Sequence, residues 1–331
     1  MTGARRQLAG ALLALSAATA SAAPAEVQAL PDDWYPESVA IGPDGSFYVG
    51  SWREGAVARL KPVKQGMASK VEVLVKPGAN GLANGQGVLV DAKHGALWIC
   101  SGSSGFTTVP QTPSALKRYD LATGAPRASY AMPDGGYCND LAQDARGNLY
   151  VTDSYHPRVL KLAPGATALT VWKEDPALAG PGPYTGLNGI AIDGGRDVYV
   201  SLVAAASHVL RIGLGVDGNA GEVTPIEAPR VLKNVDAIRA WKPGRLVLFE
   251  SNAFGEGPYG GQITVARVDG TKLGLQTVVA GLNDPSSGAV RGDRVYFIES
   301  KYSLLTKRKD GDGPVPTGVP FDIQSRALPP R

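Results

Sequence analysis

The chain repeats one pattern of apolar and polar positions at intervals of about 50 residues. Apolar or alternating runs of five or six residues lie between Gly, Pro and Asp turns, which is typical of β-strands. The second run of each repeat has an aromatic or apolar residue at an equivalent place, called here the reference position. The six reference residues are 48 to 52 residues apart: Tyr48, Trp98, Tyr150, Tyr199, Val247 and Tyr296. A period this constant indicates a repeat architecture.

Two further strand-like runs follow in each repeat. The third run has a basic residue between apolar ones, and these residues are Arg59, Lys117 with Arg118, Lys161, Arg211, Arg267 and Lys307. Candidate fourth runs begin at Val71, Ala128, Ala168 and Leu275. Four short strands in each of six repeats favour an all-β fold, a six-bladed β-propeller in which each blade packs on two neighbours. The alternative, a solenoid, would need helices or capping repeats, and the sequence suggests neither.

The two ends of the chain have different expected roles. Val27 to Leu30 can add a closing outer strand to the last blade. The Pro-rich tail from Asp310 to Arg331 is expected to run along the outside of the propeller.

A polar residue lies ten to twelve residues before each reference position, at the start of the first strand. The six residues are Glu37, Gln86, Asn139, Asn188, Asp236 and Ser286. Strand starts are often polar because they border turns, but six oxygen-bearing side chains in register favour a site at the mouth of the channel. Two carboxylates and several amide oxygens suit a hard cation, first of all Ca²⁺. Mg²⁺ and Zn²⁺ are weaker candidates, and the three His and two Cys have no zinc-ligand spacing.

Composition adds few constraints. The 42 Gly and 25 Pro fit many tight turns, and 44% apolar with 19% charged residues is ordinary for a globular protein. We expect one propeller domain over residues 23–331. A net charge of +3 does not indicate a nucleic-acid partner. The sequence lacks a P-loop, a GxSxG and an HExxH motif, which removes support for nucleotide, serine-hydrolase and zinc-protease functions.

The N-terminus has the pattern of a signal peptide over residues 1–22. Arg5 and Arg6 precede an apolar stretch from Leu8 to Ala18, and small residues at Ala20 and Ala22 suit cleavage. An uncleaved anchor is the alternative, although the stretch is too short to span a bilayer. We expect a periplasmic or secreted mature chain without a membrane span.

The two cysteines, Cys100 and Cys138, fall next to the channel mouth in adjacent blades. An oxidising compartment permits a disulfide between them, and two buried thiols are the alternative. The long polar loop that follows Cys100 is either a lid or specificity element over the mouth or a disordered insertion.

The six-blade register resembles the senescence marker protein, gluconolactonase and luciferin-regenerating-enzyme family, from about Glu37 to Lys301. The resemblance implies a divalent cation at the channel mouth, held by Glu37 in PES, Asn188 in LNGIAID and Asp236 in NVDAI. The N-D pair of the family, which contacts substrate or solvent near the metal, matches Asn139-Asp140. Sugar-lactone members have Arg two residues before this pair. Here Tyr137 takes that place, which weakens the expectation of an aldonolactone substrate.

Together these features predict an exported, metal-dependent hydrolase of lactones or related esters. The cation would polarise the carbonyl, and Asp236, or alternatively Asp140, would take a proton from the attacking water. The small-molecule substrate would contact Asn139, Gln86, Ser286 and Tyr137. Two other classes stay open: a non-catalytic propeller that binds a ligand or partner with a structural Ca²⁺, and a lyase or oxidoreductase on the same scaffold.

Overall fold

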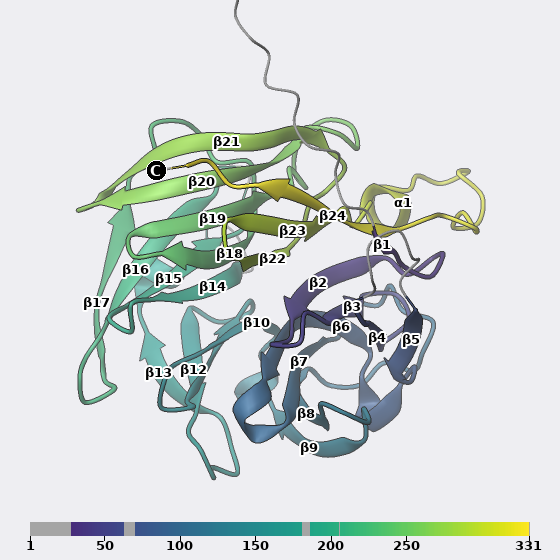
Figure 1. The fold of residues 1–331 in the computed structure, drawn as a ribbon, viewed down its shortest axis with the longest axis horizontal. Coiled ribbons are helices and arrows are strands. Elements are labelled where there is room, and N and C mark those ends of the chain that lie inside the picture. Colours follow the sequence, from purple (N-terminus) through teal and green to yellow (C-terminus); the bar gives the residue numbers. More distant parts are fainter. Residues whose placement is uncertain (1–27, 63–69, 181–185, 205, 331) are drawn as a thin grey trace, which may run out of the picture.

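The computed structural model describes residues 28–62, 70–180, 186–204 and 206–330. The chain forms six antiparallel sheets of four strands each, placed around a channel whose wall includes residues from all six innermost strands (Figure 1). The six-bladed propeller expected from the period is therefore confirmed. The expected signal peptide, residues 1–22, lies outside the described residues and stays a prediction. Within the described ranges, none of the helices has the length and apolar character to cross a membrane.

The strands of each blade follow one another in the chain, from the innermost outward. Blade 1 consists of β2 (Pro36–Ile41), β3 (Phe47–Ser51), β4 (Ala56–Leu60) and β5 (Val71–Val75). Blade 2 consists of β6 (Asn84–Asp91), β7 (Ala96–Gly102), β8 (Ala115–Asp120) and β9 (Pro126–Ala131). Blade 3 consists of β10 (Cys138–Gln143), β11 (Leu149–Asp153), β12 (Arg158–Leu162) and β13 (Thr170–Glu174).

The next two blades repeat this order. Blade 4 consists of β14 (Leu187–Asp193), β15 (Asp197–Leu202), β16 (His208–Leu214) and β17 (Ala220–Ile226). Blade 5 consists of β18 (Val235–Lys242), β19 (Arg245–Glu250), β20 (Gly261–Asp269) and β21 (Lys272–Leu282). Short 3₁₀ turns at Ala79–Gly81, Ala92–His94, Pro133–Gly135 and Pro176–Leu178 lie in the connections.

Blade 6 closes the ring with strands from both ends of the described chain. Its order from the inside is β22 (Gly288–Arg291), β23 (Arg294–Ile298), β24 (Asp322–Ala327) and β1 (Gln28–Ala29). The expected closing strand near the N-terminus is thus confirmed for Gln28 and Ala29, which pair with β24. This pairing gives blade 6 its fourth strand and joins the two ends of the described chain in one sheet.

Two expectations about blade 6 are wrong. The run around Lys307 is not its third strand, because residues Ser303–Thr306 form the short helix α1 and three basic residues follow it. The Pro-rich tail does not run along the outside, because it contributes the third strand, β24. In β24, Ile323 and Ser325 alternate with more exposed neighbours and are buried, which is the pattern a third strand needs.

The reference positions lie in the second strand of every blade, as expected. In blades 2 and 3 the third-strand cation covers the aromatic ring at this position: Arg118 lies 5.5 Å from the ring centre of Trp98, and Lys161 lies 5.7 Å from that of Tyr150. On the other side, the innermost strand places a small or aliphatic residue opposite the reference residue in five blades: Ala40, Leu89, Ala142, Ala191 and Ala289. Blade 5 is the exception, with Arg239 opposite Val247.

Candidate functional site

A β-bulge or similar irregularity at the start of the innermost strand positions five of the six predicted polar residues, whereas Ser286 precedes β22 of blade 6. In blade 1, Glu37 lies between Pro36 and Ser38, which pair with consecutive residues of β3, so Glu37 itself has no partner in the ladder. Asp236 lies in the same kind of irregularity in blade 5. In blades 2 to 4 the ladder skips two residues: Gln86 with Gly87, Asn139 with Asp140, and Asn188 with Gly189. Bulges turn side chains away from the regular alternation and are frequent next to active sites.

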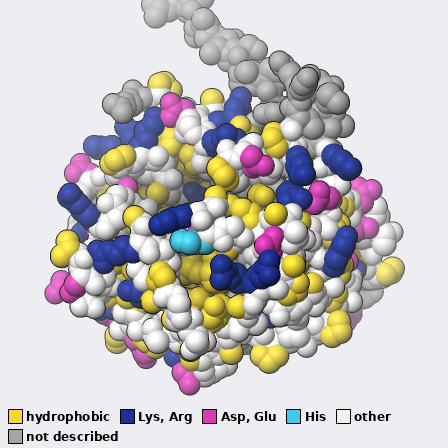
Figure 2. Space-filling model, turned by 60° about the horizontal axis from the view of Figure 1, so that its bottom comes forward, with side chains coloured by type: hydrophobic (Ala, Val, Ile, Leu, Met, Phe, Trp, Pro, Cys, Tyr) yellow, Lys and Arg dark blue, Asp and Glu magenta, His cyan; other side chains and the backbone are white. Residues whose placement is uncertain are grey.

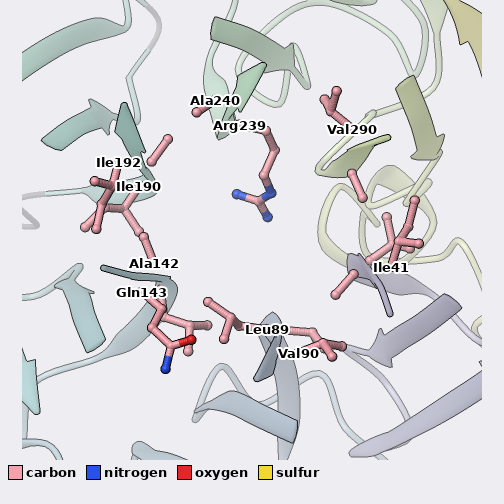
Figure 3. Close-up of a pocket in the computed structure, with 16 residues that line it drawn as sticks. Ile41, Leu89, Val90, Ala142, Gln143, Ile190, Ile192, Arg239, Ala240 and Val290 are labelled. Atoms are coloured by element: carbon pink, nitrogen blue, oxygen red, sulfur yellow. The ribbon is translucent and has the colours of Figure 1, made fainter. Parts of the chain in front are cut away.

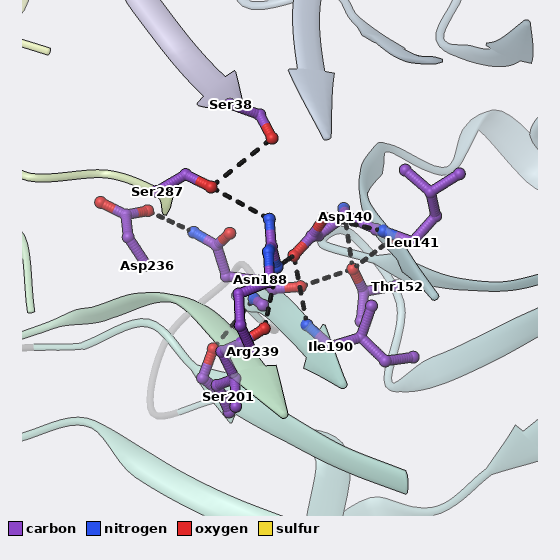
Figure 4. Close-up of polar contacts among 12 residues, drawn as sticks. Ser38, Asp140, Leu141, Thr152, Asn188, Ile190, Ser201, Asp236, Arg239 and Ser287 are labelled. Carbon is purple, nitrogen blue, oxygen red and sulfur yellow. Dashed lines mark hydrogen bonds and ion pairs between the residues drawn. The ribbon is translucent and has the colours of Figure 1, made fainter. Parts of the chain in front are cut away.

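Glu37 and Asp236 are buried carboxylates near one another at this end of the channel. Burial raises the pKa of Glu37 well above its usual value, and the negative charges of Asp236 and Asp140 raise it further. Burial also raises the pKa of Asp236, to about 7, against hydrogen bonds from Ser251 and Asn188 that lower it. The Asn188 amide donates to Asp236 Oδ1 at 2.7 Å (Figure 4). A site that gathers negative charge in this way favours either protons or a cation.

The six polar residues at the channel mouth are called here the polar ring. Two of its oxygen atoms are buried without a hydrogen-bond partner in the described part of the chain. They are Glu37 Oε2 and Asn139 Oδ1. Buried oxygen atoms are nearly always satisfied, so each unpaired one needs an explanation such as an ion. The side-chain nitrogen of Asn188 donates to Asp236 and so orients it. The side-chain oxygen of Asn188, Oδ1, is left as a further ligand for an ion. Carboxylate and amide oxygens are the ligands that Ca²⁺ takes, so the set fits a hard cation.

The fit depends on amide as well as acidic groups. Across the described ranges, no group of three or more His, Cys, Asp or Glu side chains is placed to hold a metal ion. The predicted set has only two carboxylates, Glu37 and Asp236, and Asn188 supplies the third side chain. A cation site here would therefore have low ligand charge, and low ligand charge is one of the features that sets Ca²⁺ affinity.

Gln86 links the acidic cluster to two aromatic residues. In the amide orientation that satisfies all its neighbours, Gln86 Oε1 accepts from Trp52 Nε1 at 2.7 Å and from the Tyr137 hydroxyl at 2.6 Å. The amide nitrogen then donates to Glu37 Oε1 at 3.1 Å. Gly102 lies against this network, since a Cβ at that position would be 2.3 Å from the Tyr137 hydroxyl oxygen. The amide of Gln86 is thus engaged within the protein.

The other predicted substrate residues are placed at the same end of the channel. The Ser286 hydroxyl donates to the Glu37 carbonyl oxygen at 2.7 Å and also contacts Ser300. The Asn139 amide donates to the Ser154 hydroxyl at 2.9 Å, so its unpaired oxygen has a fixed direction.

Cys138, next to Asn139, forms a disulfide with Cys100 across blades 2 and 3. The structure thus contains the bridge that the sequence left as one of two alternatives.

Asp140 lies in a different environment from Asp236, although both were candidate bases. Its Oδ2 accepts from Arg239 Nη1 at 2.7 Å, and its Oδ1 accepts from the Leu141 N–H at 2.9 Å. Arg239 also donates to the Ser287 hydroxyl at 3.0 Å, so it connects blades 3, 5 and 6 (Figure 4). Both carboxylate oxygen atoms of Asp140 are therefore engaged by donors of the protein. The geometry therefore favours Asp236 over Asp140 for proton abstraction.

Below this ion pair the channel is apolar. A cavity of about 300 Å³ is lined mainly by aliphatic side chains from the innermost strands, together with Gln143, and the guanidinium of Arg239 points into it (Figure 3). Figure 2 shows a face of the molecule with a hollow in which apolar side chains are exposed, surrounded by Lys and Arg side chains. Arg239 thus lies between the polar end of the channel and its apolar part.

Several residues of the site were not found in the sequence. Asp284 is buried and lies near Asp236, and burial raises its pKa to about 6. Tyr302 lies near Glu37 and Asp236, and burial together with their charges raises its pKa well above the usual value. Arg239 could have been found, because it replaces a small or aliphatic residue at an in-register position. Tyr302 could not, because it lies in the connection of blade 6 that was assigned to the wrong elements.

Comparisons with known proteins identify the architecture. No family model matches the chain, and no curated protein matches it. Its fold is similar to a gluconolactonase from Xanthomonas campestris, with a TM-score of 0.61 and 16% identity over 93% of this chain and 99% of that one. It is also similar to luciferin-regenerating enzyme, with a TM-score of 0.62 and 14% identity over 91% of this chain and 95% of that one. Both neighbours come from the family that the sequence register resembles.

Other neighbours carry a different chemistry. The PQQ-bound form of aldose sugar dehydrogenase from Streptomyces coelicolor matches with a TM-score of 0.56 and 15% identity over 92% of this chain and 98% of that one. Identities this low show a shared fold and leave the reaction to be argued from the site. The chain thus has the fold of the gluconolactonase and luciferin-regenerating-enzyme propellers at low sequence identity.

Proposed function

We propose that this protein is an exported hydrolase of lactones or related esters that works with a divalent cation, in the first place Ca²⁺. The observation that carries the proposal is the pair of buried carboxylates, Glu37 and Asp236, of which Glu37 has one oxygen without a partner. The ion would be held by the carboxylates of Glu37 and Asp236 and by the side-chain amide oxygen of Asn188. When bound, a divalent cation polarises a substrate carbonyl and stabilises the oxyanion.

Asp236 has the role of general base in this proposal. In the metal-free protein burial raises the pKa of Asp236 to about 7, and a bound cation would favour the ionised form, which is the form that accepts a proton. Asp236 takes a proton from water, the water oxygen bonds to the carbonyl carbon, and the C–O bond of the lactone breaks. The proton then goes to the leaving oxygen, so one lactone and one water give one hydroxy acid. Asn188 fixes the direction of Asp236 Oδ1 through its amide hydrogen bond.

The disulfide supports the exported part of the proposal. Disulfides persist in oxidising compartments and are rare in the cytosol, and Cys100 and Cys138 are bridged here. The expected signal peptide over residues 1–22 gives the route. Size determination of the mature protein from a periplasmic or culture fraction, with the N-terminus read by mass spectrometry, tests this directly. A full-length chain recovered only from the cytoplasm would contradict export.

Hydrolysis is tested by base uptake in a pH-stat over a panel of lactones, first with Ca²⁺ and then with chelator. We expect hydrolysis that the chelator removes and Ca²⁺ restores. Asp236→Asn should lower kcat/KM by about 100-fold or more. Asp217→Asn is the matched control, because Asp217 lies in an exposed turn where it accepts from the Asn219 N–H. Turnover that Asp236→Asn retains, in a folded protein, would contradict the assignment.

One comparison favours a second candidate, an oxidoreductase on the same scaffold, because a solved neighbour is a PQQ-bound sugar dehydrogenase. Dye reduction with an aldose, with and without added PQQ and Ca²⁺, separates the two. Dye reduction without lactone hydrolysis would favour this candidate.

A further inference from the structure

The connections between second and third strands carry aromatic residues in five of the six blades. They are Trp52, Phe106, Tyr155, Phe254 with Tyr259, and Tyr302 with the buried Phe321, whereas blade 4 has only Val, Ala and Ser at residues 203–207. These connections lie at the same end of the propeller as the bulges, since Ser51 at the end of β3 pairs with Pro36 beside Glu37. The aromatic residues therefore surround the end of the channel that carries the polar ring.

The exposed aromatic side chains lie in these same connections. Four large aromatic side chains are exposed in the described part of the chain, and all four belong to these connections: Phe106 at 39%, Tyr155 at 41%, Phe254 at 61% and Tyr259 at 63%. The other exposed large hydrophobic residues there are three valines. Exposed aromatic residues that gather on one face mark a binding surface.

Several of these rings form a continuous wall, called here the aromatic arc. The ring of Trp52 stacks on Phe106 with centroids 5.2 Å apart and meets the edge of Tyr302 at 5.1 Å. Tyr137 and Tyr155 contact one another with centroids 5.0 Å apart. Gln86 joins the two groups through its hydrogen bonds to Trp52 and Tyr137. The arc thus runs from blade 6 through blades 1 and 2 to blade 3, opposite Asn188 and Asp236 of blades 4 and 5.

The loop that carries Phe106 is held in place. The Thr107 hydroxyl lies 2.7 Å from the Ala83 carbonyl oxygen and 2.9 Å from the Arg53 carbonyl oxygen, and its single hydrogen is shared between them. The Thr108 N–H donates to the same Arg53 carbonyl at 2.9 Å. These bonds hold the loop, and with it Phe106, in a fixed position. This favours the loop as a specificity element over a disordered insertion.

Two polar side chains beside the arc, Gln86 and Ser286, are engaged within the protein. Gln86 is bonded to Trp52, Tyr137 and Glu37, and the Ser286 hydroxyl is bonded to the Glu37 carbonyl. A polyhydroxylated lactone would leave several hydroxyls against ring faces here, and a polar group buried without a partner costs free energy. A flat apolar ring meets no such cost and gains stacking contacts.

We propose that the preferred substrates are aryl or benzo-fused lactones and aryl esters, whose aromatic ring lies against the arc while the carbonyl faces Asp236. This inference rests on the proposed hydrolase function and adds the substrate class. The reaction is the same hydrolysis, in which the acyl C–O bond breaks: an aryl ester releases a phenol, and dihydrocoumarin opens to one acid that carries the phenol.

Three lactones with the same six-membered ring test the proposal: dihydrocoumarin, δ-valerolactone and glucono-δ-lactone. Each kcat/KM is divided by the rate constant for hydroxide-catalysed hydrolysis, which removes intrinsic reactivity. We expect the corrected value to be highest for dihydrocoumarin. Phe106→Ala should lower the ratio of dihydrocoumarin to δ-valerolactone by about three- to tenfold, as expected for one lost aromatic contact. Val216→Ala, an exposed residue in the β16–β17 turn, should leave the ratio unchanged.

A binding measurement separates failure of this inference from failure of the hydrolase function. The benzo-fused lactam dihydroquinolinone and the plain δ-valerolactam have the shapes of the two substrates and resist hydrolysis. Calorimetry should show tighter binding of dihydroquinolinone, and Phe106→Ala should reduce the difference. If the lactams behave so but no lactone is hydrolysed, the substrate-class inference holds and the hydrolase proposal fails. Equal binding of both lactams, or a higher corrected rate with glucono-δ-lactone, would overturn the inference.

Discussion

Arg239 Nη1 donates to Asp140 Oδ2 at 2.7 Å, which connects blade 5 to blade 3 across the channel. The carboxylate of Asp140 is 7% exposed and the side chain of Arg239 is 19% exposed, so the pair is largely removed from water. Gly87 makes room for it, since a Cβ there would be 2.6 Å from Asp140 Oδ1. The pair forms the boundary between the polar end of the channel and its apolar part.

Removing one partner of this pair should destabilise the fold. Arg239→Met leaves a buried carboxylate without its cation, and we expect a loss of about 2–4 kcal/mol in the free energy of unfolding. Urea denaturation at pH 7 measures it. The double variant Arg239→Met with Asp140→Leu should recover much of the loss, because no buried charge then remains.

An exposed pair of the same types is the control. Arg127 and Asp120 are 2.8 Å apart, but their side chains are 57% and 23% exposed. We expect Arg127→Met to change the free energy of unfolding by less than about 1 kcal/mol. Equal effects of Arg239→Met and Arg127→Met would show that the channel pair has no special role.

The period of the sequence was enough to predict the fold and the polar ring. A propeller blade has a fixed size, so equal spacing of Tyr48, Tyr150 and Tyr199 reports the repeat, and counting back from them reaches the bulge residues. The prediction failed where the chain departs from equal spacing. In blade 6 an insertion separates β23 from β24, so the third strand lies beyond the expected window.

The rest of the site depends on contacts that spacing does not report. The aromatic residues lie on connections of different lengths, so no constant offset from the reference positions finds them. Asp284 is a turn residue with a positive φ of 50°, a conformation that Asp tolerates and that a search for strand starts passes over. Arg239 lies three residues beyond Asp236 in β18, so the spacing of the strand starts does not report it.

Glu250 predicts a pH dependence of stability away from the candidate site. Burial acts to raise its pKa, but hydrogen bonds from Arg230, the Lys233 N–H and Thr264 outweigh this, and its pKa lies below the usual value. A depressed pKa contributes stability that is present above the unfolded value of about 4.3 and is lost as pH falls through the folded value. We expect the stability advantage of the wild type over Glu250→Gln to be full at pH 7 and to shrink below about pH 4.3.

Denaturant midpoints of both proteins between pH 3 and pH 7 measure this difference. Glu222→Gln is the control, since Glu222 is exposed on the outermost strand of blade 4. A difference between wild type and Glu250→Gln that does not change with pH would contradict a role for the charged form.

The disulfide should contribute to stability by restricting the unfolded chain. Cys100 and Cys138 are 38 residues apart, and a closed loop of this size gives about 2–4 kcal/mol. We expect the Cys100→Ala, Cys138→Ala protein to lose about that much in guanidinium denaturation. Reductant should lower the guanidinium midpoint of the wild-type protein and leave that of the double variant unchanged. A midpoint that neither change affects would contradict the prediction.

The metal-free protein should lose stability as the pH rises toward neutrality. The folded pKa of Asp236 is raised to about 7 by burial. It exceeds the value of about 3.9 for an exposed aspartate, so the folded state holds this proton more tightly. The contribution is present below about pH 4 and is lost as the pH rises through about 7. We expect Tm in chelator to fall over this range, and Asp236→Asn, which cannot ionise, to reduce the fall.

Added Ca²⁺ should act in the opposite direction. Because a cation needs the ionised carboxylates, Ca²⁺ should raise Tm more at pH 8 than at pH 5, and calorimetry should detect protons released on binding at pH 6. Asp284, with its pKa raised to about 6, contributes to the same fall, so Asp284→Asn distinguishes its share from that of Asp236. The Ca²⁺ effect should be lost in Asp236→Asn and kept in Asp284→Asn. A Ca²⁺ effect that is equal at both pH values would contradict a site built on Glu37 and Asp236.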